Sequence, residues 1–129
     1  MNVAGPFNTG PAVGSGGSAT INIDTPVLIG TIIAVGLQIN LADPVYGTGS
    51  LDLTIATKGL YPAPLPQSIL TLTAASADGW FNPRPPIHAL TGGAIANQYD
   101  VGIPIYDQVN LLVENADPDD TVDVWFLME

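Results

Sequence analysis

The side chains able to act as bases, nucleophiles or metal ligands are few in this chain of 129 residues. It has no cysteine and one histidine, His88, and its two cations, Lys58 and Arg84, face twelve Asp and Glu residues. Nucleophilic catalysis commonly needs a histidine base, and no Gly-x-Ser-x-Gly turn is present. A zinc site needs several Cys or His ligands. A Ser–His–Asp triad stays a disfavoured alternative, and we expect no enzyme activity and no cofactor.

Carboxylates are the one plentiful reactive group. A glycosidase needs two of them, but most lie in turns or on the polar sides of alternating segments, where solvation explains them. Asp117, Asp119 and Asp120 have oxygen ligands for calcium, yet they lack the glycine and the distal glutamate of an EF-hand loop. Because Pro118 fixes φ and Asp side chains bind nearby backbone, we expect a tight turn, with calcium as the alternative.

Residues 78–88 form the segment richest in recognition side chains, with Trp80, Phe81, Arg84 and the only histidine, His88. Its prolines restrict the backbone and so lower the entropy lost on binding, and Trp and Arg are enriched at interface hot spots. One interpretation is a contact surface. The other is that Trp80 and Phe81 close one end of the core while Arg84 pairs with an Asp. A loop anchored by Trp80 that presents Arg84 satisfies both.

A carbohydrate site is another interpretation of the same region. Sugar sites on β-sandwiches often combine an aromatic face with hydrogen bonds from Asp and Asn. Trp80, Asn97, Tyr99 and Asp100 provide these residue types. The sequence therefore leaves a carbohydrate-binding or receptor-binding module open as an alternative.

The formal net charge of −10 limits the classes of partner. Nucleic-acid binding depends on Lys and Arg that release counterions, so we expect no nucleic-acid partner. Anionic membranes are disfavoured for the same reason, and no apolar run reaches the ~20 residues of a membrane-spanning helix. The charge indicates solubility or a basic partner surface.

From residue 20 onward, apolar residues recur with a period of two. The clearest run alternates Ile33, Val35, Leu37 and Ile39 with small or polar residues, and frequent Gly and Pro separate such runs. Short strands between turns predict an all-β fold. We expect an antiparallel β-sandwich or a jelly-roll-like barrel of about seven to eight strands over residues 20–129.

Residues 1–19 differ from the rest because they are rich in Gly and Pro and carry no charged side chain. Such a segment buries too little apolar surface to offset its ordering entropy. We expect an extended N-terminal arm held by a neighbouring subunit or partner, the alternative being an arm folded back on its own domain. The candidate partner-binding residues in both regions are Pro6, Phe7, Pro11, Trp80, Phe81, Arg84 and His88.

The second half of the chain, residues 65–129, resembles a family of small structural proteins of tailed-phage virions. The resembling pieces are Ser68 to Thr73, Ala77 to Arg84 with His88, Gly92-Gly93-Ala94, Tyr99 to Tyr106, and Asp120 to Trp125. The resemblance implies a capsid decoration protein, or else a head–tail junction or tail component. It carries over no catalytic residue.

As a decoration protein, the chain is expected to bind the major capsid protein on the outer capsid surface of the virion, after synthesis in the host cytoplasm. The resemblance also implies a small homo-oligomer, with a trimer as the first expectation. The N-terminal arm and the sandwich loops are expected to make the contact. On this hypothesis, a chain without residues 1–19 folds normally but attaches weakly.

Overall fold

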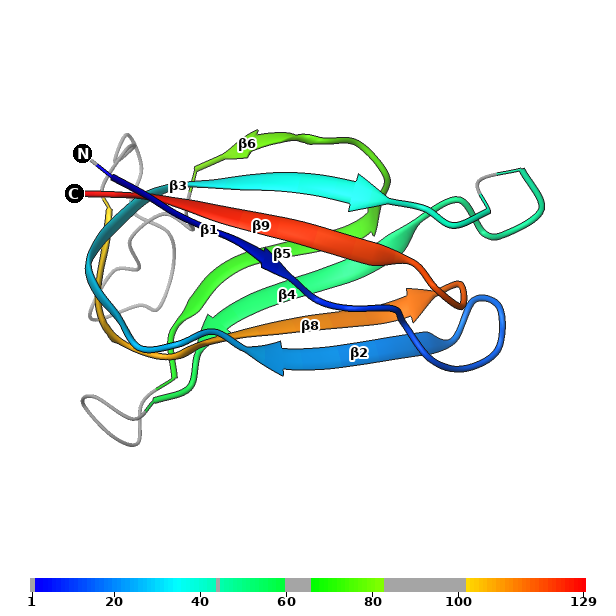
Figure 1. Ribbon diagram of the computed structural model, residues 1–129, viewed down its shortest axis with the longest axis horizontal. Coiled ribbons are helices and arrows are strands. Elements are labelled where there is room, and N and C mark those ends of the chain that lie inside the picture. The colour runs from blue at the N-terminus through cyan, green and yellow to red at the C-terminus, as the bar shows by residue number, and fades with distance from the viewer. Residues whose placement is uncertain (1, 44, 60–65, 83–101) are drawn as a thin grey trace, which may run out of the picture.

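The computed structural model describes residues 2–43, 45–59, 66–82 and 102–129, and these contain β-strands but no helix. Two antiparallel sheets pack face to face as a β-sandwich, which confirms the predicted fold class (Figure 1). The described residues form nine strands rather than about seven to eight. In this part of the chain there is no helix long and apolar enough to cross a membrane.

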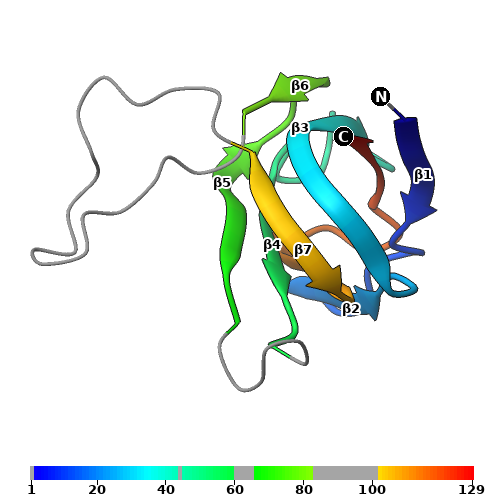
Figure 2. The same cartoon turned by 90° about the vertical axis from the view of Figure 1, so that its left-hand side faces the viewer.

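The first sheet has five strands, of which four follow one another in the order β1-β9-β3-β6. Its fifth strand, β7, pairs with the first part of β3, beside which it runs in Figure 2. The second sheet has the order β2-β8-β4-β5. The first sheet comprises β1 (Asn2–Asn8), β3 (Leu28–Asn40), β6 (Gly79–Phe81), β7 (Ile103–Asp107) and β9 (Thr121–Met128). The second comprises β2 (Ala19–Asp24), β4 (Leu51–Thr57), β5 (Ser68–Ala75) and β8 (Val109–Ala116).

The core lies between the two sheets and is built from alternate residues of each strand. Successive side chains of a strand point to opposite faces, so a period-two sequence buries one side only. In β9 the buried side holds Val122, Val124 and Phe126, each fully inaccessible to solvent. The facing sheet contributes Leu51, Leu53, Ile55, Val109, Leu111 and Val113.

The structure corrects the expectation of a separate N-terminal arm, because residues 2–9 run along β9. Strand β1 pairs antiparallel with β9, from Asn2 opposite Met128 to Asn8 opposite Asp123. The amide of Thr9 then donates to the carbonyl of Val122 at 3.0 Å, and further backbone bonds join Ala12 to the turn at 117–120. The chain therefore folds this segment back on its own domain, the alternative left open by the sequence.

Main-chain hydrogen bonds to a distant strand overcome the low hydrophobicity of this segment. The Phe7 side chain points inward, with its ring centroid 6.0 Å from that of Phe126. Ala12 is almost completely buried, at 1% exposure. Packing and pairing within the domain thus hold the segment, in place of the neighbouring subunit or partner that we expected from the sequence.

Removal of β1 is therefore predicted to destabilise the domain, contrary to the expectation from the sequence. Deletion of residues 2–13 leaves the hydrogen-bonding edge of β9 open and uncovers Phe126. Phe7→Ala is the milder change, and we expect it to lower the free energy of unfolding by about 1–3 kcal/mol. Urea denaturation measures both effects.

Val13→Ala is the matched control, because this side chain is 72% exposed at the end of the same segment. We expect its effect to stay within about 0.5 kcal/mol. A deletion variant with the urea midpoint of the full chain would show that β1 contributes nothing to the fold.

Candidate functional site

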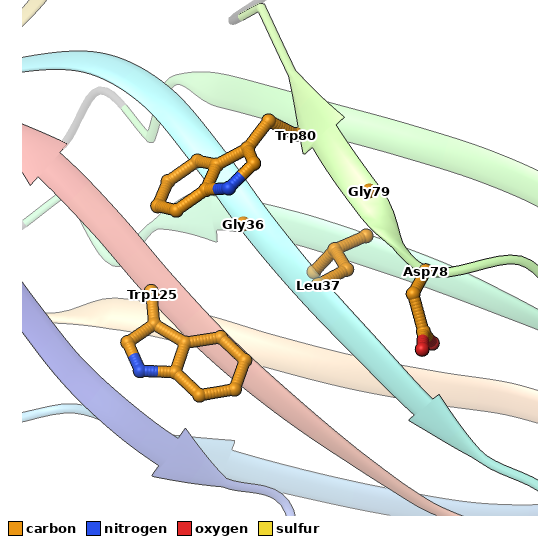
Figure 3. A pocket seen from close by; sticks show the side chains of 6 residues that line it. All are labelled: Gly36, Leu37, Asp78, Gly79, Trp80 and Trp125. Carbon is orange, nitrogen blue, oxygen red and sulfur yellow. The ribbon is translucent and has the colours of Figure 1, made fainter.

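A row of paired residues crosses the outer surface of the five-stranded sheet. Trp80 in β6 lies opposite Gly36 in β3, and Gly36 lies opposite Trp125 in β9. Directly paired residues of antiparallel strands project to the same face. The two indoles therefore flank a residue that has no side chain, as Figure 3 shows.

This arrangement leaves an open groove of about 350 Å³ on the sheet. Its lining residues are Gly36, Leu37, Asp78, Gly79, Trp80 and Trp125 (Figure 3). Most of the lining is apolar, and Asp78 is its one carboxylate. Grooves of this kind, with aromatic walls and few polar groups, are the usual form of ligand sites.

Gly36 determines how Trp80 sits. A Cβ atom at Gly36 would lie 2.9 Å from the atoms of the six-membered ring of Trp80, closer than real Cβ contacts. The indole therefore rests directly on the backbone of β3, while 59% of the residue remains exposed. One side of the tryptophan is fixed by the sheet and the other is open to a partner.

Two carboxylates lie near the groove on this part of the sheet. Asp78 accepts a hydrogen bond from the amide of Ile39 at 2.8 Å. Asp123, two positions before Trp125 and on the same face, accepts hydrogen bonds from the side-chain amides of Asn8 at 2.7 Å and Asn40 at 3.2 Å. The donors of these hydrogen bonds are a backbone amide and two side-chain amides, none of which carries a charge.

The two outer surfaces of the sandwich differ in polarity. The outer face of the five-stranded sheet carries four exposed apolar or aromatic side chains, Val3, Ile29, Trp80 and Tyr106, with Trp125 and Leu127 half-buried between them. The outer face of the four-stranded sheet carries mainly polar and acidic side chains, among them Thr20, Asn22, Asp24, Asp52, Glu114 and Thr71. The five-stranded sheet thus exposes more apolar and aromatic side chains than the four-stranded sheet, and Asn8, Gln38, Asn40 and Asp123 lie on the same outer face.

The predicted pair Trp80 and Phe81 divides between the two roles considered. Phe81 is half-buried and packs against the core, whereas Trp80 points to the outer face. The packing of Phe81 agrees with the core-closing interpretation, whereas Trp80 is exposed and its role as a contact residue stays a prediction. Arg84 and His88 lie outside the described residues, as do the other proposed sugar-binding residues Asn97, Tyr99 and Asp100.

The three candidates of the N-terminal segment do not form a common surface with Trp80. Phe7 packs against Phe126 in its own core, so its expected contact with a partner is replaced by an internal one. Pro6 lies in the irregular stretch of β1 between Ala4 and Phe7, and Pro11 is exposed beyond the strand. Of the proposed partner-binding residues that the structure describes, Trp80 is the one that lines the groove.

The acidic turn at residues 117–120 binds backbone amides. The Asp117 carboxylate accepts hydrogen bonds from the amide of Gly17 at 3.0 Å and from the amide of Thr48 at 2.6 Å. Asp120 is fully buried and accepts from the amides of Ala42, at 2.8 Å, and Asp117, at 3.0 Å. The turn thus ties together two loops at one end of the sandwich, as expected for the structural interpretation.

The environment of Asp117 favours its ionised form. Burial by itself raises the pKa of this carboxyl, but the hydrogen bonds donated by Thr48 and Gly17 outweigh burial and hold its pKa below the ordinary value. Within the described residues, no group of three or more Asp, Glu or His side chains is placed to hold a metal ion.

Sequence reasoning missed Gly36 and Trp125. The alternation of β9 already placed Trp125 opposite the apolar side formed by Val122, Val124 and Phe126. A large aromatic residue on the polar side of a strand is a signal for an exposed contact site. Nothing in the sequence alone places Gly36 beside it, because that depends on strand register.

Comparisons with protein-family models, curated proteins and solved structures found no match to this chain.

Replacement of Asp117 is predicted to destabilise the loop end of the sandwich. Asp117→Asn turns an amide group toward the donors of Gly17 or Thr48, so we expect a melting temperature several degrees lower at pH 7. Asp119→Asn makes the same change in charge at an exposed position of the turn and is the control.

The effect of pH follows from the lowered pKa. Asp117 contributes its stability above the unfolded pKa of about 3.9 and loses it as pH falls through the folded value. The difference in melting temperature between the wild type and Asp117→Asn should thus be full at pH 5 to 7 and shrink below pH 4. A difference that is the same at pH 3 and pH 7 would contradict this account.

Proposed function

We propose that this chain is a non-enzymatic structural protein of a phage virion, a decoration protein that binds the major capsid protein on the outside of the head. The phage assignment is supported by the resemblance of residues 65–129 to small virion proteins. The structural observation that supports a surface-binding role is the polarity difference between the two faces of the sandwich. One face is suited to docking and the other to solvent.

The chemistry of the chain suits this role. Exposed aromatic and apolar side chains around an apolar groove favour an interaction site on this face. The net charge of −10 disfavours contact with packaged DNA or its fragments. A shell presents many copies of the same site, so an oligomer, for which a trimer is our first expectation, gains avidity from weak individual contacts.

A component of the head–tail junction or of the tail is the alternative structural role in the virion. Such a component could use the same apolar and aromatic surface, so the position of the protein in the particle distinguishes the two roles. Decoration predicts many copies over the whole shell, whereas a junction protein is confined to one vertex.

A carbohydrate-binding or receptor-binding module is the second candidate. The observation that favours it is the exposure of Trp80, because a buried indole would have removed the aromatic platform that a sugar ring needs. Asp78 at the groove adds one hydrogen-bonding carboxylate. The rest of the proposed sugar site, at residues 97–100, lies outside the described residues.

Attachment to capsids tests the proposal. We expect the purified chain to co-sediment saturably with capsids of the phage that encodes it, after these have been stripped of the protein. Gold-labelled antibody should mark the entire head surface in electron micrographs. An acidic β-sandwich of unrelated sequence is the control for charge and shape.

Three results would count against the proposal. Absence of co-sedimentation would reject attachment to the shell. Label restricted to one vertex or to the tail would replace decoration by the junction or tail role. Saturable binding to a neutral glycan on an array, without capsid binding, would favour the carbohydrate module.

A further inference from the structure

We infer that the groove between Trp80 and Trp125 receives an apolar, uncharged side chain of the shell protein, flanked there by lysine or arginine. This inference rests on the proposed function and names the contact through which attachment occurs. It assigns the docking role to the sheet surface, in place of the N-terminal segment that the sequence suggested.

The lining of the groove favours an apolar occupant. Two indoles and two glycines form much of its surface, Leu37 also lines it, and its volume is about 350 Å³. Burial of apolar surface contributes about 25 cal/mol per Å². An apolar side chain between the two tryptophans therefore gains more binding free energy from burial than a polar side chain would.

A sugar ring fits the same lining less well. Its hydroxyl groups need several hydrogen-bond partners, and each one buried without a partner costs about 1–3 kcal/mol. Asp78 is the one carboxylate in the groove, and one of its oxygens already accepts the amide of Ile39. The groove thus offers stacking surface but few groups that could bind hydroxyls.

The charges around the groove indicate what flanks the occupant. Asp78 lines it and Asp123 stands on the same face, and their hydrogen-bond donors are a backbone amide and two asparagine side chains. Complementary charges across an interface speed the encounter and fix its register. Lysine or arginine beside the apolar side chain would meet these carboxylates, in keeping with a chain whose net charge is −10.

The site is organised before the partner arrives. The Trp80 indole lies against the backbone of Gly36, which limits the rotamers that it can adopt. A side chain that is already ordered loses little entropy on binding, and tryptophan is among the residue types enriched at interface hot spots. We therefore expect Trp80 to dominate the contact energy.

The experiment measures attachment of full-length variants to stripped capsids. Trp80→Ala is expected to weaken attachment by about tenfold or more, and Trp125→Ala by a smaller factor. Gly36→Ala, which displaces the indole of Trp80, is expected to weaken it without removing any aromatic group. Tyr46→Ala is the matched control, since it deletes a 90% exposed aromatic residue outside the groove and should leave attachment within twofold.

Two further variants test the charges. Asp78→Asn keeps an acceptor oxygen for the amide of Ile39, whereas Asp123→Asn keeps only one of the two acceptor oxygens that Asn8 and Asn40 use; both changes remove a negative charge. We expect weaker attachment at low salt, together with a smaller loss of attachment between 50 and 500 mM NaCl than the wild type shows. Melting temperatures check that each variant is folded, and Trp80→Phe, with an intermediate effect, replaces Trp80→Ala if the latter unfolds.

The outcomes separate the two proposals. If the wild type attaches and Trp80→Ala attaches equally well, the inference is overturned while the proposed function stands. If the wild type does not attach, the proposed function is rejected, and the inference that the groove binds a side chain of the shell protein is rejected as well. If a neutral oligosaccharide such as maltoheptaose quenches the tryptophan fluorescence of the wild type and not of Trp80→Ala, the groove is a sugar site and the inference is overturned.

Discussion

Burial of alternate side chains between the two sheets is the constraint on which the rest of the structure depends. Strand β9 lies at the centre of this arrangement, because it pairs with β1 on one side and β3 on the other. Its inward side chains, Val122, Val124 and Phe126, are fully buried. Because these inward side chains must enter the core, the register of β9 against its neighbours is set. The same register places the outward side chain of Trp125 opposite Gly36.

Many of the carboxylates in this acidic chain accept hydrogen bonds from backbone amides. Asp107 accepts from the amides of Gly59 and Gln108, and Asp117 and Asp120 fasten the loops at the other end. The one ion pair among the described residues, Lys58 with Asp24, is half exposed and contributes little. Backbone amides thus serve as hydrogen-bond donors to these carboxylates in a chain with only two cations. The same hydrogen bonds attach loops to the strands.

The same alternation that builds the core also separates the two outer surfaces. Residues between the buried positions are mainly polar or acidic on β2, β8, β4 and β5, whereas on β9, β3 and β6 they include Trp125, Gly36 and Trp80. No catalytic group is needed to explain this second pattern. An apolar groove with one carboxylate in its lining is the feature of the outer surface that this pattern produces.

The sequence by itself determined the fold class, the inward face of most strands and the tight acidic turn at residues 117–120. Each of these depends on local information, namely a period of two, turn residues and Asp side chains that reach nearby amides. Tertiary structure alone decided the place of β1, because its hydrogen-bond partners in β9 are more than 110 residues away in the chain. It also decided the groove, since Gly36, Trp80 and Trp125 come from three strands distant in sequence and meet only through the register of their pairing.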